Sequence, residues 1–332
     1  MLPLLIIKNL ALVLGLGILI ILLLGLLVGT INSWFLVKQR KLSLLPIKNN
    51  DRIMIIAPHP DDEILATGGL LTHFFKNAIP VKIIYLTCGD SNPSLFWRDK
   101  KLKFSPDKFI QTGIERKQEA ETAIKILGGD KKDLLFLGYP DNRLWQMWLK
   151  PKTNVVSSTT LLNHSPYNFT FKKHRYYKGD NIISDLNESI KKFKPTIIFS
   201  PHLRETNLDH RASGLFIKNL VKKINWSGKL YYYLIHYKWM RLFRIYPPKN
   251  LFKNREKILY PPCSLWEKDK WFSFWLQPDQ LKTKKTALQK YKSQRIVPTL
   301  NWLFRSFSTQ NEIFQLVNHP YRSSRRKSFT RL

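Results

Sequence analysis

Residues 52–63 read RIMIIAPHPDDE and place a cluster of ionisable residues directly after a short apolar run. The run over residues 52–57 is short, apolar and bounded by polar residues and proline, which predicts a buried β-strand. Four ionisable side chains follow where the strand gives way to a helix, namely His59, Asp61, Asp62 and Glu63. The stretch therefore predicts a strand–turn–helix unit with a reactive turn.

Further along the chain, strand-like and helix-like segments alternate. Apolar runs typical of strands occur at Val81–Cys88, Asp133–Tyr139, Pro195–Ser200 and Lys229–Tyr237. Helical patterns lie between them at Asp62–Asn77, Phe109–Leu127, Ile182–Phe193 and Asp209–Ile224. This alternation predicts an α/β fold with βαβ units and a mostly parallel sheet. In such sheets, ligands bind beyond the carboxyl ends of the strands.

The first reactive turn has the side chains of a metal site. His59 and Asp62 are three residues apart, so both can turn toward one point, and imidazole and carboxylate are suitable ligands for Zn²⁺. Asp61 is then free to act as a base. The alternative is a helix-capping cluster, in which an aspartate caps the helix and Glu63 adds favourable charge. Capping needs only one of these residues and does not call for His59 between two prolines.

A second polar segment, residues 200–211, also follows a predicted strand and opens a helix. It can therefore meet the first turn at the same edge of the sheet, with His210 as the third ligand. A His-Asp-His set with an open fourth position is typical of catalytic zinc rather than structural zinc. The two cysteines, Cys88 and Cys263, have no CxxC spacing, which excludes a cysteine-built zinc knuckle.

The N-terminal part predicts a membrane anchor. Residues 9–37 carry no charge, and about 20 apolar residues span a bilayer core as a helix. We expect a single-pass anchor over residues 1–37 and a linker over 38–50. Lys38, Arg40 and Lys41 then follow the span, which favours the cytoplasmic face for the catalytic domain. The net charge of +32 further suggests an anionic partner, such as an anionic lipid surface or a phosphorylated glycan.

Residues 241–332 differ from the α/β part. They are rich in aromatic and basic side chains, contain two Pro-Pro pairs and show one clear helical pattern near Leu281–Gln294. We expect an irregular, basic C-terminal extension after a catalytic domain at residues 51–240.

Several motifs in order resemble one known family. They are the AHPDDE turn, the Arg116-x-x-Glu119-x-x-x-Ala123 helix, the segment Leu137–Asp141 and the late Asp209-His210 pair. This series is similar to the PIG-L/LmbE-like zinc-dependent N-acetylglucosaminyl deacetylases over roughly residues 50–240. The resemblance implies a Rossmann-like fold, one Zn²⁺ and removal of the acetyl group from an N-acetyl amino sugar, possibly within a lipid-linked or phosphorylated glycoconjugate. By position, it implies that His59, Asp62 and His210 bind the metal, Asp61 is the general base, Arg116 contacts the substrate and Asp141 lines the pocket.

The late motif departs from the family at one position. Many members have histidine where this chain has Asn207. An asparagine can donate a hydrogen bond to an oxyanion but cannot act as a general acid. His236, at the end of the last predicted strand, is a candidate replacement, and a purely structural histidine is the alternative.

Three other classes of protein stay open at this point. A membrane-anchored glycosyltransferase could use Asp61 and Asp62 for a metal–nucleotide, but it would need neither histidine and would take Mn²⁺ or Mg²⁺. A catalytically inactive glycan-binding relative rests on Asn207 alone. A nucleic-acid binder has the charge in its favour, but the chain has no RNP1, C₂H₂ or bZIP motif.

Overall fold

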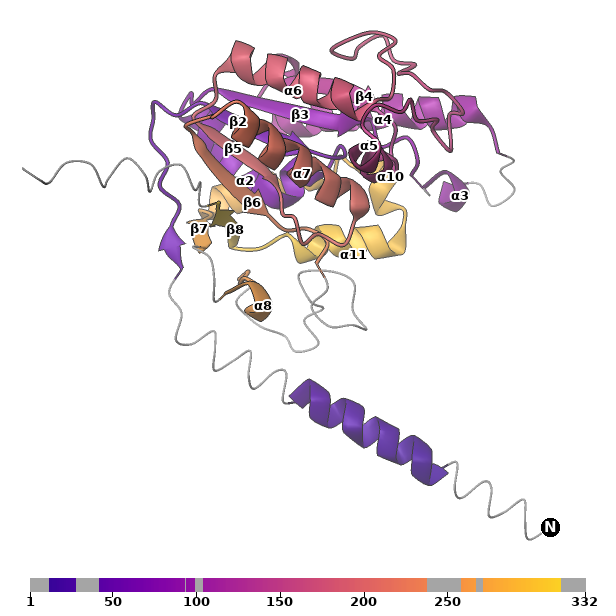
Figure 1. Cartoon of the computed structure of the whole chain (residues 1–332). Coiled ribbons are helices and arrows are strands. Elements are labelled where there is room, and N and C mark those ends of the chain that lie inside the picture. The colour runs from indigo at the N-terminus through magenta and orange to yellow at the C-terminus, as the bar shows by residue number, and fades with distance from the viewer. Residues whose placement is uncertain are drawn as a thin grey trace, which may run out of the picture. The chain divides into compact units, whose positions relative to one another are not determined.

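The computed structural model describes residues 12–27, 42–92, 94–98, 104–237, 258–266 and 271–317. The chain divides into two compact units (Figure 1). The smaller unit comprises Met1–Leu42 and Tyr260–Lys268, and its described part holds a helix over residues 12–27 and helix α8 (Cys263–Trp266). The larger unit comprises Ser43–Leu259 and Asp269–Leu332 and carries the sheet.

The larger unit is built on an eight-stranded sheet in the order β1-β7-β8-β6-β5-β2-β3-β4. Its strands are β1 (Ser43–Leu44), β2 (Ile53–Ala57), β3 (Val81–Thr87), β4 (Leu134–Tyr139), β5 (Ile197–Pro201), β6 (Lys229–Tyr233), β7 (Trp271–Trp275) and β8 (Asn311–Leu316). Strands β6, β5, β2, β3 and β4 are parallel neighbours, and β1 is parallel to β7, whereas β8 is antiparallel to both β6 and β7. The predicted α/β fold with a mostly parallel, Rossmann-like sheet is confirmed.

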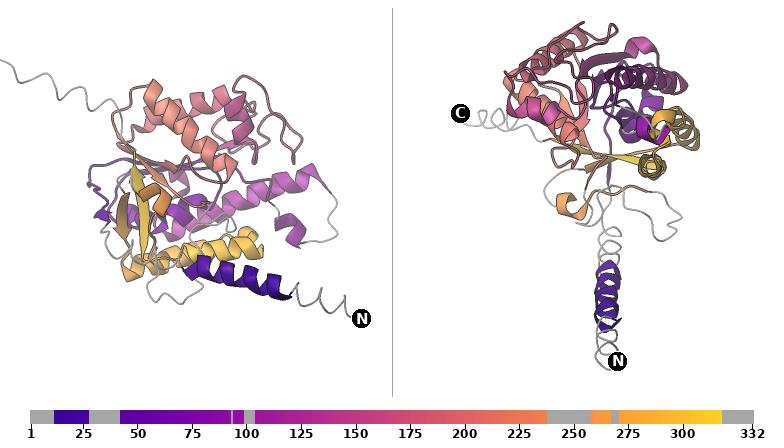
Figure 2. Two further views of the ribbon diagram at one scale, coloured as in Figure 1. Left: turned by 60° about the horizontal axis from the view of Figure 1, so that its bottom comes forward. Right: turned by 90° about the vertical axis from the view of Figure 1, so that its right-hand side faces the viewer.

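Helices cover both faces of this sheet. The longer ones are α2 (Asp62–Lys76), α4 (Pro106–Ile126), α6 (Gly179–Phe193), α7 (Leu208–Lys223), α9 (Pro278–Leu288) and α11 (Pro298–Ser306), and the short ones are α3 (Ser94–Arg98), η1 (Lys131–Asp133), α5 (Leu144–Leu149) and α10 (Lys292–Arg295). Helices α5, α6 and α7 pack together, and α2, α4 and α9 form the other layer. Figure 2 shows the two groups on opposite sides of the sheet.

The central strand β2 is buried on both faces. Met54 and Ile56 belong to the apolar cluster that includes Leu186 of α6 and Phe216 of α7. The intervening residue Ile55 is also fully buried and points to the opposite face, since side chains alternate along a strand. A continuous apolar run such as IMII is therefore what this position requires.

The order in which successive strands join the sheet reverses at β2. From β2 it proceeds to β3 and β4 on one side, and β5 and β6 lie on the other side. Such a reversal leaves a crevice outside the carboxyl ends of the two central strands, where doubly wound sheets bind ligands. The turns after β2 and β5 are those that the sequence predicts to be reactive.

The expectation of an irregular C-terminal extension is wrong over its described part. Strands β7 and β8 extend the sheet beyond β6, and helix α9 packs against α2 and α4. The side chains of Lys284 and Glu312 are fully buried there, with Lys284 Nζ 2.7 Å from Glu312 Oε1. The sequence-based prediction was wrong because a basic and aromatic composition does not indicate which lysine is buried against a distant glutamate. Residues 238–257, 267–270 and 318–332 lie outside the described residues.

The prediction of a single-pass membrane anchor, and with it of a membrane location with a cytoplasmic catalytic domain, is corrected. Over the part of the chain that the structure describes, none of the helices combines the length and the apolar character that crossing a membrane requires. Residues 1–11 and 28–41 lie outside the described residues.

Candidate metal centre and active site

The turn between β2 and α2 fixes the first two predicted ligands. The backbone N–H of His59 donates to Asp62 Oδ2 at 2.9 Å, and Nδ1 of the same histidine lies 3.2 Å from that oxygen. Asp62 is 2 % exposed and opens the helix. Burial alone would raise the pKa of Asp62, but the neighbouring His210 and His59 hold it well below its usual range. Asp62 is therefore present as a carboxylate.

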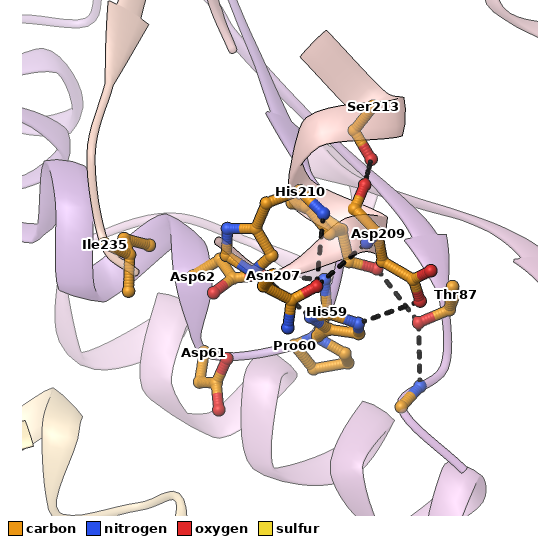
Figure 3. Close-up of polar contacts among 12 residues, drawn as sticks. His59, Pro60, Asp61, Asp62, Thr87, Asn207, Asp209, His210, Ser213 and Ile235 are labelled. Carbon is orange, nitrogen blue, oxygen red and sulfur yellow. Dashed lines mark hydrogen bonds and ion pairs between the residues drawn. The ribbon is translucent and has the colours of Figure 1, made fainter. Parts of the chain in front are cut away.

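The second turn brings the third predicted ligand to the same point. Asn207 caps α7, since its Oδ1 accepts from the backbone N–H groups of Asp209 at 2.9 Å and His210 at 3.3 Å. This cap places His210 in the first helical turn, with Nε2 3.2 Å from Asp62 Oδ2. Figure 3 shows the side chains of His59, Asp62 and His210 gathered between the two turns. The predicted meeting of these turns is confirmed.

The three donors fit a metal ion. One ligand atom each from His59, Asp62 and His210 lies within 4.8 Å of the others. A tetrahedral Zn²⁺ with bonds of 2.0–2.1 Å sets its ligand atoms about 3.3 Å apart, and both nitrogen-to-Asp62 distances are 3.2 Å. Both ring nitrogens of His210 are buried and, among the described residues, neither makes a hydrogen bond of good geometry, since Nε2 faces Asp62 Oδ2 at 3.2 Å and Nδ1 lies 3.9 Å from Glu205 Oε1. A buried nitrogen without such a partner is the state that a coordinated cation would satisfy.

The far side of the His59 ring meets two more carboxylates. Nε2 lies 3.1 Å from Asp141 Oδ1 and 3.4 Å from Asp209 Oδ2. Asp209 also accepts from the backbone N–H groups of Asn142 at 2.6 Å and Leu144 at 3.0 Å. An acceptor on Nε2 fixes the tautomer that leaves Nδ1 free for a metal. Asp141 thus lies at the site through His59, and its predicted role in lining the pocket stays a prediction. The contact of Asp209 with His59 was missed, although the sequence motif contained this residue.

Asp61, the predicted base, stands beside the metal ligands in an unusual backbone conformation with φ 127°. Its Oδ2 lies 3.2 Å from Nη2 of Arg116. Burial raises the pKa of Asp61 well above its usual value, and the charge of Arg116 opposes this rise. A carboxyl group whose pKa moves toward neutrality is better suited to exchange protons with a substrate.

Arg116 is buried and bonded within the protein. It is 3 % exposed and donates to the carbonyl oxygens of Gly89 at 2.9 Å and Pro60 at 2.6 Å, besides its contact with Asp61. The predicted contact with substrate stays a prediction. What the structure describes is a guanidinium that holds the Asp61 turn in place.

Asn207, a possible oxyanion donor, and His236, the candidate acid, both lie near His210. Because Oδ1 of Asn207 is used by the helix cap, its amide nitrogen is the end left for a ligand. The ring of His236 is 4.8 Å from that of His210, centroid to centroid. Burial lowers the pKa of His236 to about 4, and the charge of His210 acts in the same direction, so its imidazole is neutral. Their catalytic roles stay predictions.

One residue that sequence reasoning left without a role positions His236. Glu205 is fully buried and accepts from the backbone N–H groups of Ile235 at 2.5 Å and His236 at 2.6 Å. The carbonyl of His236 in turn accepts from the N–H of Thr206 at 2.7 Å. The turn after β5 and the end of β6 are thus tied together. A buried glutamate in a polar turn gives no sequence signal for such backbone partners.

Comparison with known proteins agrees with this geometry. Residues 54–221 match the PIG-L family, described as GlcNAc-PI de-N-acetylase, and the chain belongs to this family. It is 30% identical over 89 residues to a 1D-myo-inositol 2-acetamido-2-deoxy-alpha-D-glucopyranoside deacetylase of Mycobacterium sp. (strain KMS). These aligned residues make up 27% of this chain and 28% of that protein. It is 29% identical over 103 residues to a probable N-acetyl-alpha-D-glucosaminyl L-malate deacetylase 2 of Bacillus anthracis, covering 30% of this chain and 40% of that protein.

Solved structures share the fold. The zinc-inhibited form of a teicoplanin deacetylase superposes with a TM-score of 0.52 at 14% identity, covering 81% of this chain and 99% of the other. The N,N'-diacetylchitobiose deacetylase of Pyrococcus horikoshii gives a TM-score of 0.50 at 16% identity and covers 84% and 88% of the two chains. At these identities the likeness concerns the fold. The expected LmbE-like architecture is thereby confirmed.

Proposed function

We propose that the protein is a zinc-dependent hydrolase that removes the acetyl group from an N-acetyl amino sugar. The observation that carries the proposal is the meeting of Nδ1 of His59, Oδ2 of Asp62 and Nε2 of His210 at ligand spacing, with the buried carboxyl group of Asp61 next to them. Three protein ligands leave a position for water or substrate, as in hydrolytic zinc sites. Membership of the PIG-L family supports the same reaction class.

The roles of the side chains follow from their places. A bound Zn²⁺ supplies Lewis acidity to the acetamide carbonyl and to water in the site. Asp61 accepts the proton of the attacking water, and Arg116 keeps the Asp61 carboxyl group in position. The amide nitrogen of Asn207 donates a hydrogen bond to the oxyanion that forms. The C–N bond then breaks, and Asp61 passes the proton that it took from water to the leaving amine. The neutral imidazole of His236 is left as an alternative hydrogen-bond donor to the oxyanion.

The substrate class rests on the family and on charge. The matched relatives are named for acetamido sugars joined to inositol or malate, and this chain spans less than half the length of either. The net charge of +32 supports an anionic aglycone, so we propose a phosphorylated or lipid-linked N-acetyl amino sugar. Acetate release from free, phosphorylated and lipid-linked GlcNAc, measured at several salt concentrations, tests this choice. Equal rates on all three compounds would contradict the preference for an anion.

The reaction itself is tested by acetate release together with metal analysis of the purified protein. We expect one zinc per chain and metal-dependent release of acetate. Asp61→Asn should abolish release while zinc stays bound, and Asp180→Asn, which changes an exposed carboxylate on α6, should leave both unchanged. Retained turnover in Asp61→Asn would contradict the base assignment. A zinc-loaded protein that binds glycans but releases no acetate would support the inactive relative instead.

A further inference from the structure

We propose that residues Tyr291–Gln294, at the start of α10, position the catalytic turn from the C-terminal part of the chain. We call this segment the C-terminal clip. The inference rests on the proposed function, because it assigns the clip the task of holding the base Asp61. No motif of the family region points to it, since the clip lies in the part of the chain after residue 240.

Asp61 needs to be held. Its φ of 127° is a conformation that residues with a side chain adopt at a cost in free energy. Its carbonyl accepts from the backbone N–H groups of Ile64 at 3.1 Å and Leu65 at 3.0 Å, as the start of α2 requires. These bonds fix the carbonyl side of the residue. The N–H side has a different partner.

That partner is Glu63, which the clip itself holds. The N–H of Asp61 donates to Glu63 Oε2 at 3.0 Å. The other oxygen, Oε1, accepts a hydrogen bond from the phenolic hydroxyl of Tyr291. Both Glu63 and Tyr291 are fully buried. One carboxylate therefore links the strained base to a residue some 230 positions further along the chain.

The clip has two further anchors on elements that bear the site. Ser293 donates to Glu119 of α4 through its N–H at 2.7 Å and its hydroxyl at 2.6 Å. Glu119 lies one helical turn beyond Arg116, the residue that contacts the Asp61 carboxyl group. Gln294 Oε1 accepts from the Asn92 side chain at 2.5 Å, in the loop that follows β3. The clip thus joins α2, α4 and this loop.

A purely structural alternative is that Tyr291 only fills space in the core. Tyr231 of β6 provides the comparison, because it is also fully buried and its hydroxyl has no hydrogen-bond partner among the described residues. Tyr231→Phe and Tyr291→Phe each remove one buried hydroxyl oxygen. Only the second removes a bond on the route to Asp61.

The experiment compares these two variants with the zinc-loaded full chain in two assays. Hydrogen exchange reports local opening, and we expect the peptide covering residues 58–66 to exchange faster in Tyr291→Phe alone. Because a small misplacement of a catalytic group lowers turnover strongly, kcat should fall about tenfold with KM and zinc content unchanged. Tyr231→Phe should match the wild type in both assays.

A second variant keeps the proposal testable if Tyr291→Phe folds poorly. Glu63→Gln preserves volume and should produce the same faster exchange, and adding Tyr291→Phe to it should cause little further change, since both act on one route. Unchanged exchange over residues 58–66 in both folded variants would overturn the clip. If the wild type releases no acetate from any compound, the proposed function fails, and the exchange assay still decides on the clip.

Discussion

The buried pair of Lys284 and Glu312 allows a sharp test of how the C-terminal part is held. Lys284 Nζ lies 2.7 Å from Glu312 Oε1 and donates to the carbonyl of Leu65 at 3.0 Å. Glu312 also accepts from the backbone N–H groups of Gly69 at 2.8 Å and Leu70 at 2.9 Å. Both side chains are fully buried. The pair therefore joins α9 and β8 to the middle of α2.

Glu312→Gln removes the negative charge and leaves the ammonium group without its counter-ion. Breaking a buried pair on one side costs about 3–5 kcal/mol in the free energy of unfolding. For a unit of this size, this corresponds to a fall in melting temperature of roughly 6–20 °C. Removing both charges with Lys284→Met and Glu312→Gln should recover part of the loss, because no unpaired charge then stays buried.

The measurement is thermal unfolding followed by circular dichroism at fixed pH and salt. The matched control is Lys76→Met, which breaks the exposed contact of Lys76 Nζ with Asp279 Oδ2, where the two side chains are 70% and 62% exposed. An exposed pair contributes less than about 1 kcal/mol. A Glu312→Gln variant as stable as this control, or a double variant that is less stable than Glu312→Gln, would refute the reasoning.

Three further predictions follow from the site and its surroundings. In Gly89→Ala the new Cβ would lie 1.8 Å from Arg116 Nη1, so acetate release should fall. The control is Gly128→Ala, because Gly128 also has a positive φ but the atom nearest to its new Cβ is 3.3 Å away. This control should lose stability without the loss of acetate release. Added Zn²⁺ should raise the melting temperature of the wild type, a chelator should reverse this, and His210→Ala should respond to neither. Burial raises the pKa of Asp90 to about 7. Between about pH 4 and pH 7, the Asp90 carboxyl group is therefore protonated in the folded state and ionised in the unfolded state. Stability from this group is therefore lost as pH rises toward 7, by up to about 4 kcal/mol, and melting temperatures at pH 5 and pH 8 should differ less in Asp90→Asn.

The sequence predicts the central part of the molecule well because local patterns determine it. Strands β2 to β6 lie within a few residues of their predicted positions, since each is a short apolar run between polar turns. The meeting of His59, Asp62 and His210 follows from topology, because parallel strands end at one edge of the sheet. The predicted domain boundaries at residues 37, 50 and 240 stay predictions.

The rest depends on contacts between distant residues that no local pattern marks. Nothing near Tyr291 indicates that its hydroxyl meets Glu63, and the polar residues of β8 give no alternation that predicts a strand in the sheet. The role of Asp209 likewise depends on backbone groups of the loop before α5.

The position of β1 has a consequence for biosynthesis. This strand leaves the ribosome early, yet its sheet partner β7 begins at Trp271. Until β7 and β8 emerge, the open side of β6 presents unpaired backbone groups of the kind that recruit other chains. A nascent polypeptide would therefore expose an unpaired sheet edge between the synthesis of β6 and that of β8.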